Sequence, residues 1–183
     1  GLSHEERIWW LGEVETRPGN WRDAFNALTW LTFPLGKAAL NLRRHRALAG
    51  RRHIARPEAK RAPSHDALAQ FDECGIVLAS PDIGIGTGLL RQDETAACRR
   101  HGSVPMQRAL NKEGLKVFVF GHGSLDLLRD SRIGLCGMAT FFHVDDGWLD
   151  RPLAAQIADI DGRIAQRLCG DLSTRAGLRN FQV

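Results

Sequence analysis

The stretch NWRDAFNALTWLTFPLGKAALN, residues 20–41, determines how the rest of the chain is expected to fold. Asn20 is suited to begin a helix, because its side chain can accept a hydrogen bond from the free backbone N–H groups of the first turn. Phe33-Pro34 divides the stretch, since the residue before a proline avoids the helical region and proline suits a first helical position. The stretch therefore predicts a hairpin of two helices over residues 20–49.

Polar side chains interrupt both helices of this hairpin. The first helix is apolar nearly all round, which is typical of a helix buried on both sides, so Asp23 and Asn26 are expected in the interior or in a cleft. In the second helix, Lys37, Asn41 and Arg44 share one face. Two helices with a short link pack antiparallel by default, so the two polar rows are expected to meet. The alternative is that these residues only cap, pair and face solvent.

Composition indicates one globular domain with a sizeable core. The chain has 183 residues, of which 43% are hydrophobic and 25% charged. It contains no apolar run long enough for a transmembrane helix and begins with acidic residues where a signal peptide needs basic ones. The cysteines, Cys74, Cys98, Cys136 and Cys169, include no CxxC pair, so we expect reduced thiols in a cytoplasmic protein without a cysteine zinc site.

Most of the positive charge is concentrated in one segment. Residues 43–61 contain eight Lys and Arg against Glu58, a net charge of +7, whereas the whole chain carries +4. We expect the second helix to stop at Gly50 and a basic loop to extend to residue 63. Such a segment could bind nucleic acid weakly through phosphate contacts, or it could be a solvated loop, and no interleaved aromatics favour base stacking. The arginines concerned are Arg43, Arg44, Arg46, Arg51 and Arg52.

The remaining sequence predicts short strands and further helices. Apolar runs favour strands over 76–80, 115–121 and 134–143. Helical signals favour a helix from Ser64 to Gly75, helical structure with a break over 90–113, and a final amphipathic helix over 150–169. Residues 1–19 are expected to anchor on the hairpin through Ile8, Trp9, Trp10 and Leu11, and residues 171–183 are expected to form a loosely attached tail. The predicted fold is α+β, with the helical hairpin and the C-terminal helix packed on a small mixed sheet in a single domain.

Two later segments contribute candidate site residues. Asp72 lies at the edge of the buried face of the 64–74 helix, and Asp66 and Glu73 share a different face. His122 stands between two glycines directly after the clearest strand, where ligands often bind in open α/β sheets. The alternative for His122 is a ring satisfied by a backbone carbonyl.

We therefore predict one polar pocket assembled from separate segments. Its catalytic candidates are His122, Asp72, Glu73 and Lys37, and its substrate-binding candidates are Asn26, Asn41, Asp23 and Asp66. Such groups suit acid–base hydrolysis of a small molecule, and a carboxylate–imidazole set is compatible with a divalent metal, although no HExxH motif identifies one. The alternative functions are a nucleic-acid-binding or partner-binding module using the basic segment 43–61, and partner binding through the aromatic N-terminus.

Three ordered motifs carry a family resemblance over Trp21 to Leu168. NALTWLTFPLGKAALN, DALAQFDECG and VFVFGHG resemble a bacterial family of uncharacterised proteins, the domain-of-unknown-function family three-zero-two-five. The resemblance implies a bacterial origin and brings no activity to transfer. It implies His where this chain has Arg22 and Ala where it has Gly123. The matching positions are Asn26, Ala27, Leu28, Phe33, Pro34, Lys37, Asn41, Asp66, Phe71, Asp72, Glu73, Phe120, Gly121 and His122.

Overall fold

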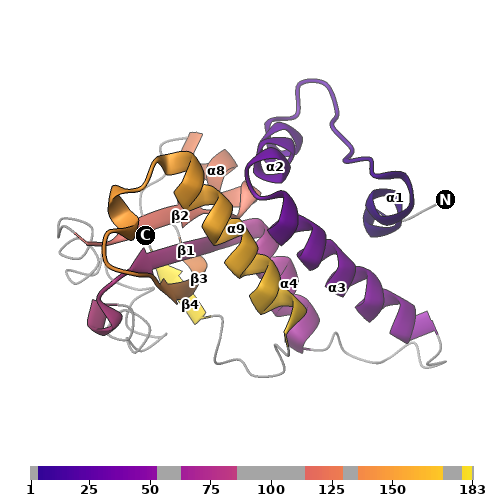
Figure 1. Ribbon diagram of the computed structural model, residues 1–183. Helices are drawn as coiled ribbons and strands as arrows, with labels where there is room; N and C mark the ends of the chain where they lie inside the picture. Colours follow the sequence, from indigo (N-terminus) through magenta and orange to yellow (C-terminus); the bar gives the residue numbers. More distant parts are fainter. Residues whose placement is uncertain (1–3, 53–62, 86–113, 130–135, 171–178, 183) are drawn as a thin grey trace.

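A computed structural model describes residues 4–52, 63–85, 114–129, 136–170 and 179–182 (Figure 1). Its elements in chain order are α1 (His4–Leu11), α2 (Trp21–Thr32), α3 (Pro34–Arg52), α4 (Pro63–Cys74), β1 (Gly75–Ser80), β2 (Lys116–Val119), α8 (His122–Arg129), β3 (Cys136–His143), the 3-10 turn η1 (Trp148–Asp150), α9 (Leu153–Cys169) and β4 (Arg179–Gln182). The predicted α+β class is confirmed. The helix predicted over 90–113 lies outside the described residues, as do Cys98 and residues 53–62 of the expected basic loop.

The sheet is mixed and its strand order is β2-β1-β3-β4. β1 pairs antiparallel with β2, with Val77 opposite Phe118, and parallel with β3, with Val77 opposite Thr140. β4 pairs antiparallel with β3. The prediction of a loosely attached tail is therefore wrong for residues 179–182, because their backbone groups complete the ladder at one edge of the sheet.

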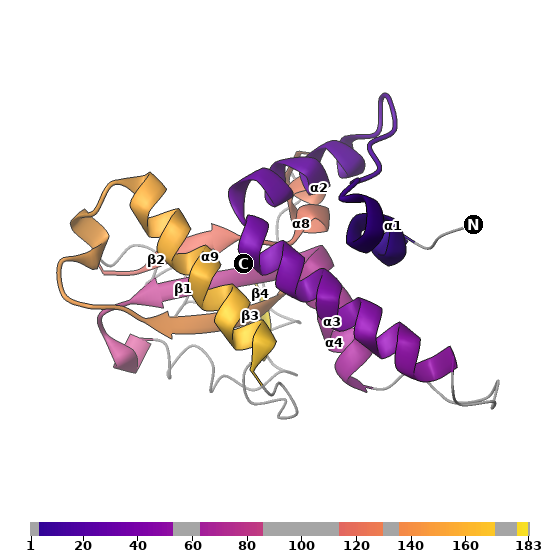
Figure 2. The same ribbon diagram turned by 45° about the vertical axis from the view of Figure 1, so that its right-hand side comes forward.

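The helices cover the sheet and bury most of the core. Figures 1 and 2 show α9 lying across one face of the strands with α3 running beside it. Alternate residues of β1 serve two hydrophobic clusters: Val77 and Ala79 join the main core beneath the helices, and Ile76 and Leu78 join a smaller cluster. The fully apolar sequence of β1 is explained by this burial on both faces.

A buried carboxylate on α9 fixes where α3 begins. Asp161 accepts hydrogen bonds from the backbone N–H groups of Leu35 and Gly36, at 3.0 and 2.7 Å. These donors belong to the first turn of α3, where backbone N–H groups lack helical partners and the helix dipole favours a negative charge. The contact ties the hairpin to the C-terminal helix.

Replacing Asp161 by alanine is expected to lower the free energy of unfolding by about 1–3 kcal/mol, because one buried and one partly buried donor lose their acceptor. Urea denaturation measures the change. Asp145→Ala is the matched control, since this carboxylate is exposed and meets Arg151 only at 3.8 Å; its effect should stay within about 0.5 kcal/mol. Equal stability of the Asp161 variant and the wild type would contradict this account.

The hairpin differs from prediction in its exposed faces and its end. α2 buries Asn26 and Thr29, while Leu28 and Leu31 are exposed, the latter to 80%. The helix therefore packs through its polar side, and the expectation that it is buried all round is wrong. α3 continues through Gly50 to Arg52, because a glycine that keeps helical dihedrals does not end a helix; the glycines with positive φ in the described residues lie elsewhere.

Other helix starts were also misplaced by sequence reasoning. α9 begins at Leu153 after Pro152, not at Asp150, which belongs to η1. The residue before Pro152 is held in an extended conformation, which separates the two elements. α8 begins directly at His122, so this candidate residue lies in the first turn of a helix.

α1 contacts α3 through part of the predicted apolar anchor, since Ile8 lines a pocket with α3 residues and the rings of Trp9 and Trp10 meet His45. Trp10 is 67% exposed, and Trp9 stacks only on His45, with ring centroids 5.6 Å apart. No residue of α1 is buried. Polar contacts of Glu5 with Asn41 and Arg44 also hold the helix.

Candidate functional site

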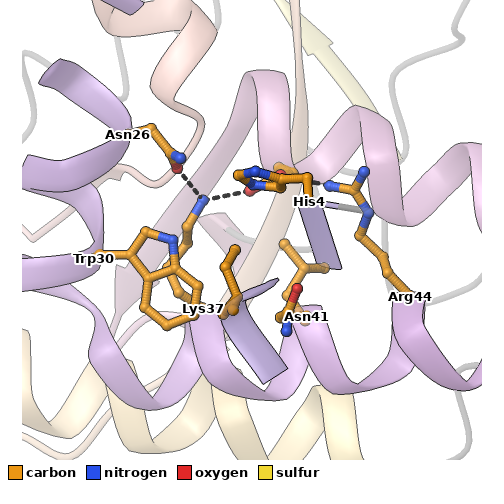
Figure 3. A pocket seen from close by; sticks show the side chains of 9 residues that line it. His4, Asn26, Trp30, Lys37, Asn41 and Arg44 are labelled. Atoms are coloured by element: carbon orange, nitrogen blue, oxygen red, sulfur yellow. Dashed lines mark hydrogen bonds and ion pairs between the residues drawn. The ribbon is translucent and has the colours of Figure 1, made fainter. Parts of the chain in front are cut away.

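Lys37 is the centre of a buried polar cluster (Figure 3). Its side chain, 3% exposed, places the ammonium 2.8 Å from Oδ1 of Asn26 and 2.5 Å from Oδ1 of Asp72. The three residues come from α3, α2 and α4. The prediction that the polar rows of the hairpin meet is confirmed for Asn26, which contacts Lys37, but not for Asp23.

Asp72 joins two cations. Its second oxygen accepts from Nη1 of Arg44 at 2.7 Å, so both oxygens of the carboxylate are bonded. Burial alone would raise the pKa of Asp72, but the charge and hydrogen bond of Lys37 outweigh this effect and hold the pKa below its ordinary value of 3.8. Asp72 is therefore ionised at neutral pH and compensates the buried ammonium.

His122 reaches the same carboxylate residue through its backbone. Nδ1 lies 2.9 Å from the carbonyl oxygen of Asp72, and because a carbonyl can only accept, Nδ1 carries the hydrogen. The alternative of a ring satisfied by a backbone carbonyl is thus confirmed for this nitrogen. The other nitrogen, Nε2, lies 3.5 Å from Oε2 of Glu73. In the neutral ring Nε2 is an acceptor, so one imidazole nitrogen is fixed and the other is a base.

Glu73 connects this imidazole to the surface. Its carboxylate pairs with the guanidinium of Arg22, and both side chains are substantially exposed. Glu73 can lie this close to the start of α8 only because residue 123 is a glycine: a Cβ at that position would lie 2.7 Å from Oε2 of Glu73 and 2.9 Å from its carbonyl oxygen. His122 therefore stands between a buried ion-pair cluster and a carboxylate that solvent can reach.

The pKa of His122 is expected to lie below its ordinary value of 6.5, because burial disfavours the imidazolium and the neighbouring carboxylates offset this only in part. A lowered pKa means that the unfolded state binds the proton first, so this group's contribution to stability is full above pH 6.5 and is lost as pH falls towards the folded pKa. NMR titration of the His122 ring protons measures this pKa. A midpoint above 6.5 for His122 would contradict the neutral tautomer.

The structure brings together most, but not all, of the predicted residues. Asn26, Lys37, Asp72 and His122 form one connected cluster, and Glu73 adjoins it. Asn41 lines the pocket on the Lys37 side. Asp23 does not take part: Arg17 binds it through its backbone and guanidinium and holds its pKa at about 2. Asp66 lies in the first turn of α4, and its side chain is outside the described residues.

Several contributors were not predicted as site residues. His4 and Ile8 of α1 line the pocket, and Glu5 of the same helix pairs with Arg44; no local pattern in the sequence links these residues to α3. The space that can take the centre of a water molecule is about 10 Å³, enough for one water. Arg22 was not a site candidate, although it lies one turn before Asn26 on α2.

The basic segment is partly committed to internal contacts. Arg43 donates to the carbonyl oxygens of Leu168 and Gly170, and Arg44 pairs with Asp72 and Glu5. Two of the five arginines proposed for nucleic acid therefore stabilise the fold. Arg46 is exposed, and the side chains of Arg51 and Arg52 lie outside the described residues.

The described residues contain neither a metal-binding cluster nor a membrane-spanning helix. No group of three or more His, Cys, Asp or Glu in the described ranges is placed to hold a metal ion. His122 and Glu73 form only a pair, and the guanidinium of Arg22 stands beside them. None of the described helices is both long and apolar enough to span a membrane.

Comparison with known proteins identifies a family without an assigned role. Curated proteins and solved structures gave no match. A family model described as a protein of unknown function, DUF3025, matches residues 2–182, which extends well beyond the Trp21–Leu168 region covered by the three motifs. Because this match spans nearly the whole chain, the protein belongs to the DUF3025 family.

Proposed function

We propose that this protein is a hydrolytic enzyme acting on a small molecule, with His122 as the general base. The observation that carries the proposal is the arrangement of the imidazole: Nδ1–H is held by the carbonyl of Asp72, and Nε2 faces the carboxylate of Glu73 at 3.5 Å. Both atoms are acceptors when the ring is neutral, so a donor placed to one side of the pair, such as a water or a substrate hydroxyl, can bond to both.

The reaction that fits is activation of water. Nε2 accepts a proton from the water as it attacks the substrate, and the carboxylate of Glu73 stabilises the imidazolium that forms. The proton then passes to the leaving group. A neutral imidazole with a lowered pKa suits this role, because it is unprotonated and available at neutral pH.

The buried ion pairs are assigned a positioning role. Asp72 fixes His122 through its carbonyl while its carboxylate is held by Lys37 and Arg44. Lys37 and Asp72, predicted as catalytic, are thus proposed to orient the base. Arg22 positions Glu73 on the exposed side.

The test uses a substitution that keeps one nitrogen and removes the other. His122→Asn retains an N–H donor near the Nδ1 position for the Asp72 carbonyl but has no counterpart of Nε2. A panel of chromogenic esters, phosphoesters and glycosides should reveal one class that the wild type hydrolyses. His122→Asn should then lower kcat by about 10²–10⁴-fold.

Two controls separate chemistry from folding. His143→Asn replaces an exposed histidine that also meets a backbone carbonyl, that of Pro81 at 2.9 Å, and should keep full activity. The melting temperature of His122→Asn should stay near that of the wild type. Full activity of His122→Asn, or no hydrolysis of any class by the wild type, would refute the proposal.

A further inference from the structure

The pocket beneath α1 has an electrostatic imbalance that α1 corrects. Three elements, α2, α3 and α4, supply its walls, including Lys37, Arg44 and Asp72. With two cations and one carboxylate, these walls carry a net charge of +1. Glu5 of α1 supplies the second carboxylate, 2.7 Å from Nη2 of Arg44, and neutralises the site.

Glu5 pairs with only one of the two neighbouring donors, Nε and Nη2, of the Arg44 guanidinium. A carboxylate binds a guanidinium best through two parallel hydrogen bonds, and the Nε and Nη2 donors form one such fork. Glu5 engages Nη2, whereas Nε of Arg44 is buried and has no hydrogen-bond partner in the described part of the chain. The amide of Asn41, 7% exposed, donates only to the backbone carbonyl of Glu5, at 3.3 Å. Nε of Arg44 and the amide of Asn41 are therefore available to a carboxylate that, unlike that of Glu5, is not fixed to a helix.

The covering helix is weakly held. α1 has eight residues, none of them buried, and residues 12–20 connect it to α2 without helix or strand. An isolated helix of this length is marginal in water, so α1 depends on its contacts with α3. Among the described elements it is therefore a candidate for local opening.

We propose that the walls formed by α2, α3 and α4 bind a small carboxylate ligand, and that Glu5 occupies its place in this structure. Arg44 holds the ligand carboxylate with its Nε–Nη2 fork and Asn41 donates to it. Trp30 and Leu40, which line the same pocket, accommodate an apolar or aromatic body. α1 moves aside when the ligand binds. The proposal is independent of the hydrolytic role, so His122→Asn should bind the ligand as the wild type does.

Benzoate is a suitable probe, with benzamide as its neutral counterpart. By isothermal titration, Glu5→Gln should bind benzoate at least about tenfold more tightly than the wild type, because the internal competitor loses its charge. Adding Arg44→Lys to this variant should abolish the gain, since lysine keeps the charge but lacks the fork. Glu13→Gln removes another N-terminal carboxylate, one that pairs with Arg7, and should match the wild type.

A second measurement does not depend on any variant. In the wild type, saturating benzoate should increase hydrogen exchange at the α1 amides, and benzamide should not. Benzoate binding that is no tighter in Glu5→Gln, a gain that survives Arg44→Lys, or α1 exchange that benzoate leaves unchanged would each overturn the proposal.

Discussion

Replacing Asp72 by asparagine is expected to lower the free energy of unfolding by about 3–5 kcal/mol, because it leaves a buried ammonium without its counter-ion. Lys37 is 3% exposed and its other hydrogen-bond acceptor is the neutral Asn26. Arg44 keeps Glu5, so the loss falls mainly on Lys37. Urea denaturation at neutral pH measures the change.

Two comparisons make this experiment specific to the buried pair. Glu13→Gln breaks an exposed ion pair with Arg7 and should cost at most about 1 kcal/mol. Lys37→Met combined with Asp72→Asn removes both charges, so the double variant should be more stable than Asp72→Asn alone. A double variant that is less stable than Asp72→Asn would show that the pair is not the origin of the effect.

The Asp72 carboxylate also accounts for part of the stability that the protein loses at low pH. Because the pKa of Asp72 is held below 3.8, its contribution to stability is full above that pH and is lost as pH falls through the folded pKa. Asp72→Asn should therefore lose less stability than the wild type below about pH 4. A functional site in which like charges repel one another would instead be stabilised by Asp72→Asn. Repeating the urea denaturation with divalent metals tests whether a metal contributes to stability.

Local sequence patterns were sufficient for the parts of the site that lie on one helix. Lys37, Asn41 and Arg44 share a face because helical periodicity requires it, and Phe33-Pro34 places the turn that brings Asn26 opposite Lys37. The contact of Asp72 with Lys37 depends instead on how α4 packs against α3. The sequence indicated only that Asp72 lies at the edge of the buried face of its helix. The site was predictable as a set of residues, but the division between a buried ion-pair cluster and a pair formed by the buried His122 imidazole and the exposed Glu73 carboxylate was not.

The errors share a physical cause, which is competition from partners distant in sequence. Asp23 was assigned to the site from its place on α2, but Arg17 in the preceding turn captures it. The strand at residues 179–182 carries no local signal, since its backbone groups are satisfied by β3. Glu5 likewise gains its role only from Arg44, which the sequence placed on the polar face of the second helix and in the basic segment, with no sign of a partner in α1. Contacts between segments distant in sequence determine the partners of these residues, and the periodicity of the sequence does not reveal such contacts.

Replacing Gly121 by alanine is expected to destabilise the fold by about 3 kcal/mol or more, because the added methyl group has nowhere to go. A Cβ at this position would lie 2.3 Å from the backbone nitrogen of Gly75 and 2.5 Å from Cα of Cys74. These are backbone atoms, so no side-chain rotation relieves the clash. The N–H groups of Phe120 and Gly121 both donate to the carbonyl of Gly75 at 2.9 Å, which fixes the close approach at the start of β1.

The matched control is Gly162→Ala, on α9, where a Cβ meets no atom within 4 Å. It should raise stability by about 0.4–1 kcal/mol, since alanine restricts the unfolded chain and favours the helix. Urea denaturation compares both variants with the wild type. Since Gly121 precedes His122 and Cys74 follows Glu73, the shift that relieves the clash must change the distance between the imidazole and the carboxylate. Gly121→Ala should therefore alter the NMR titration of His122 under conditions where the variant remains folded. If the variant has the stability and the His122 titration of the wild type, the close approach of Gly121 to Cys74 and Gly75 does not position the site.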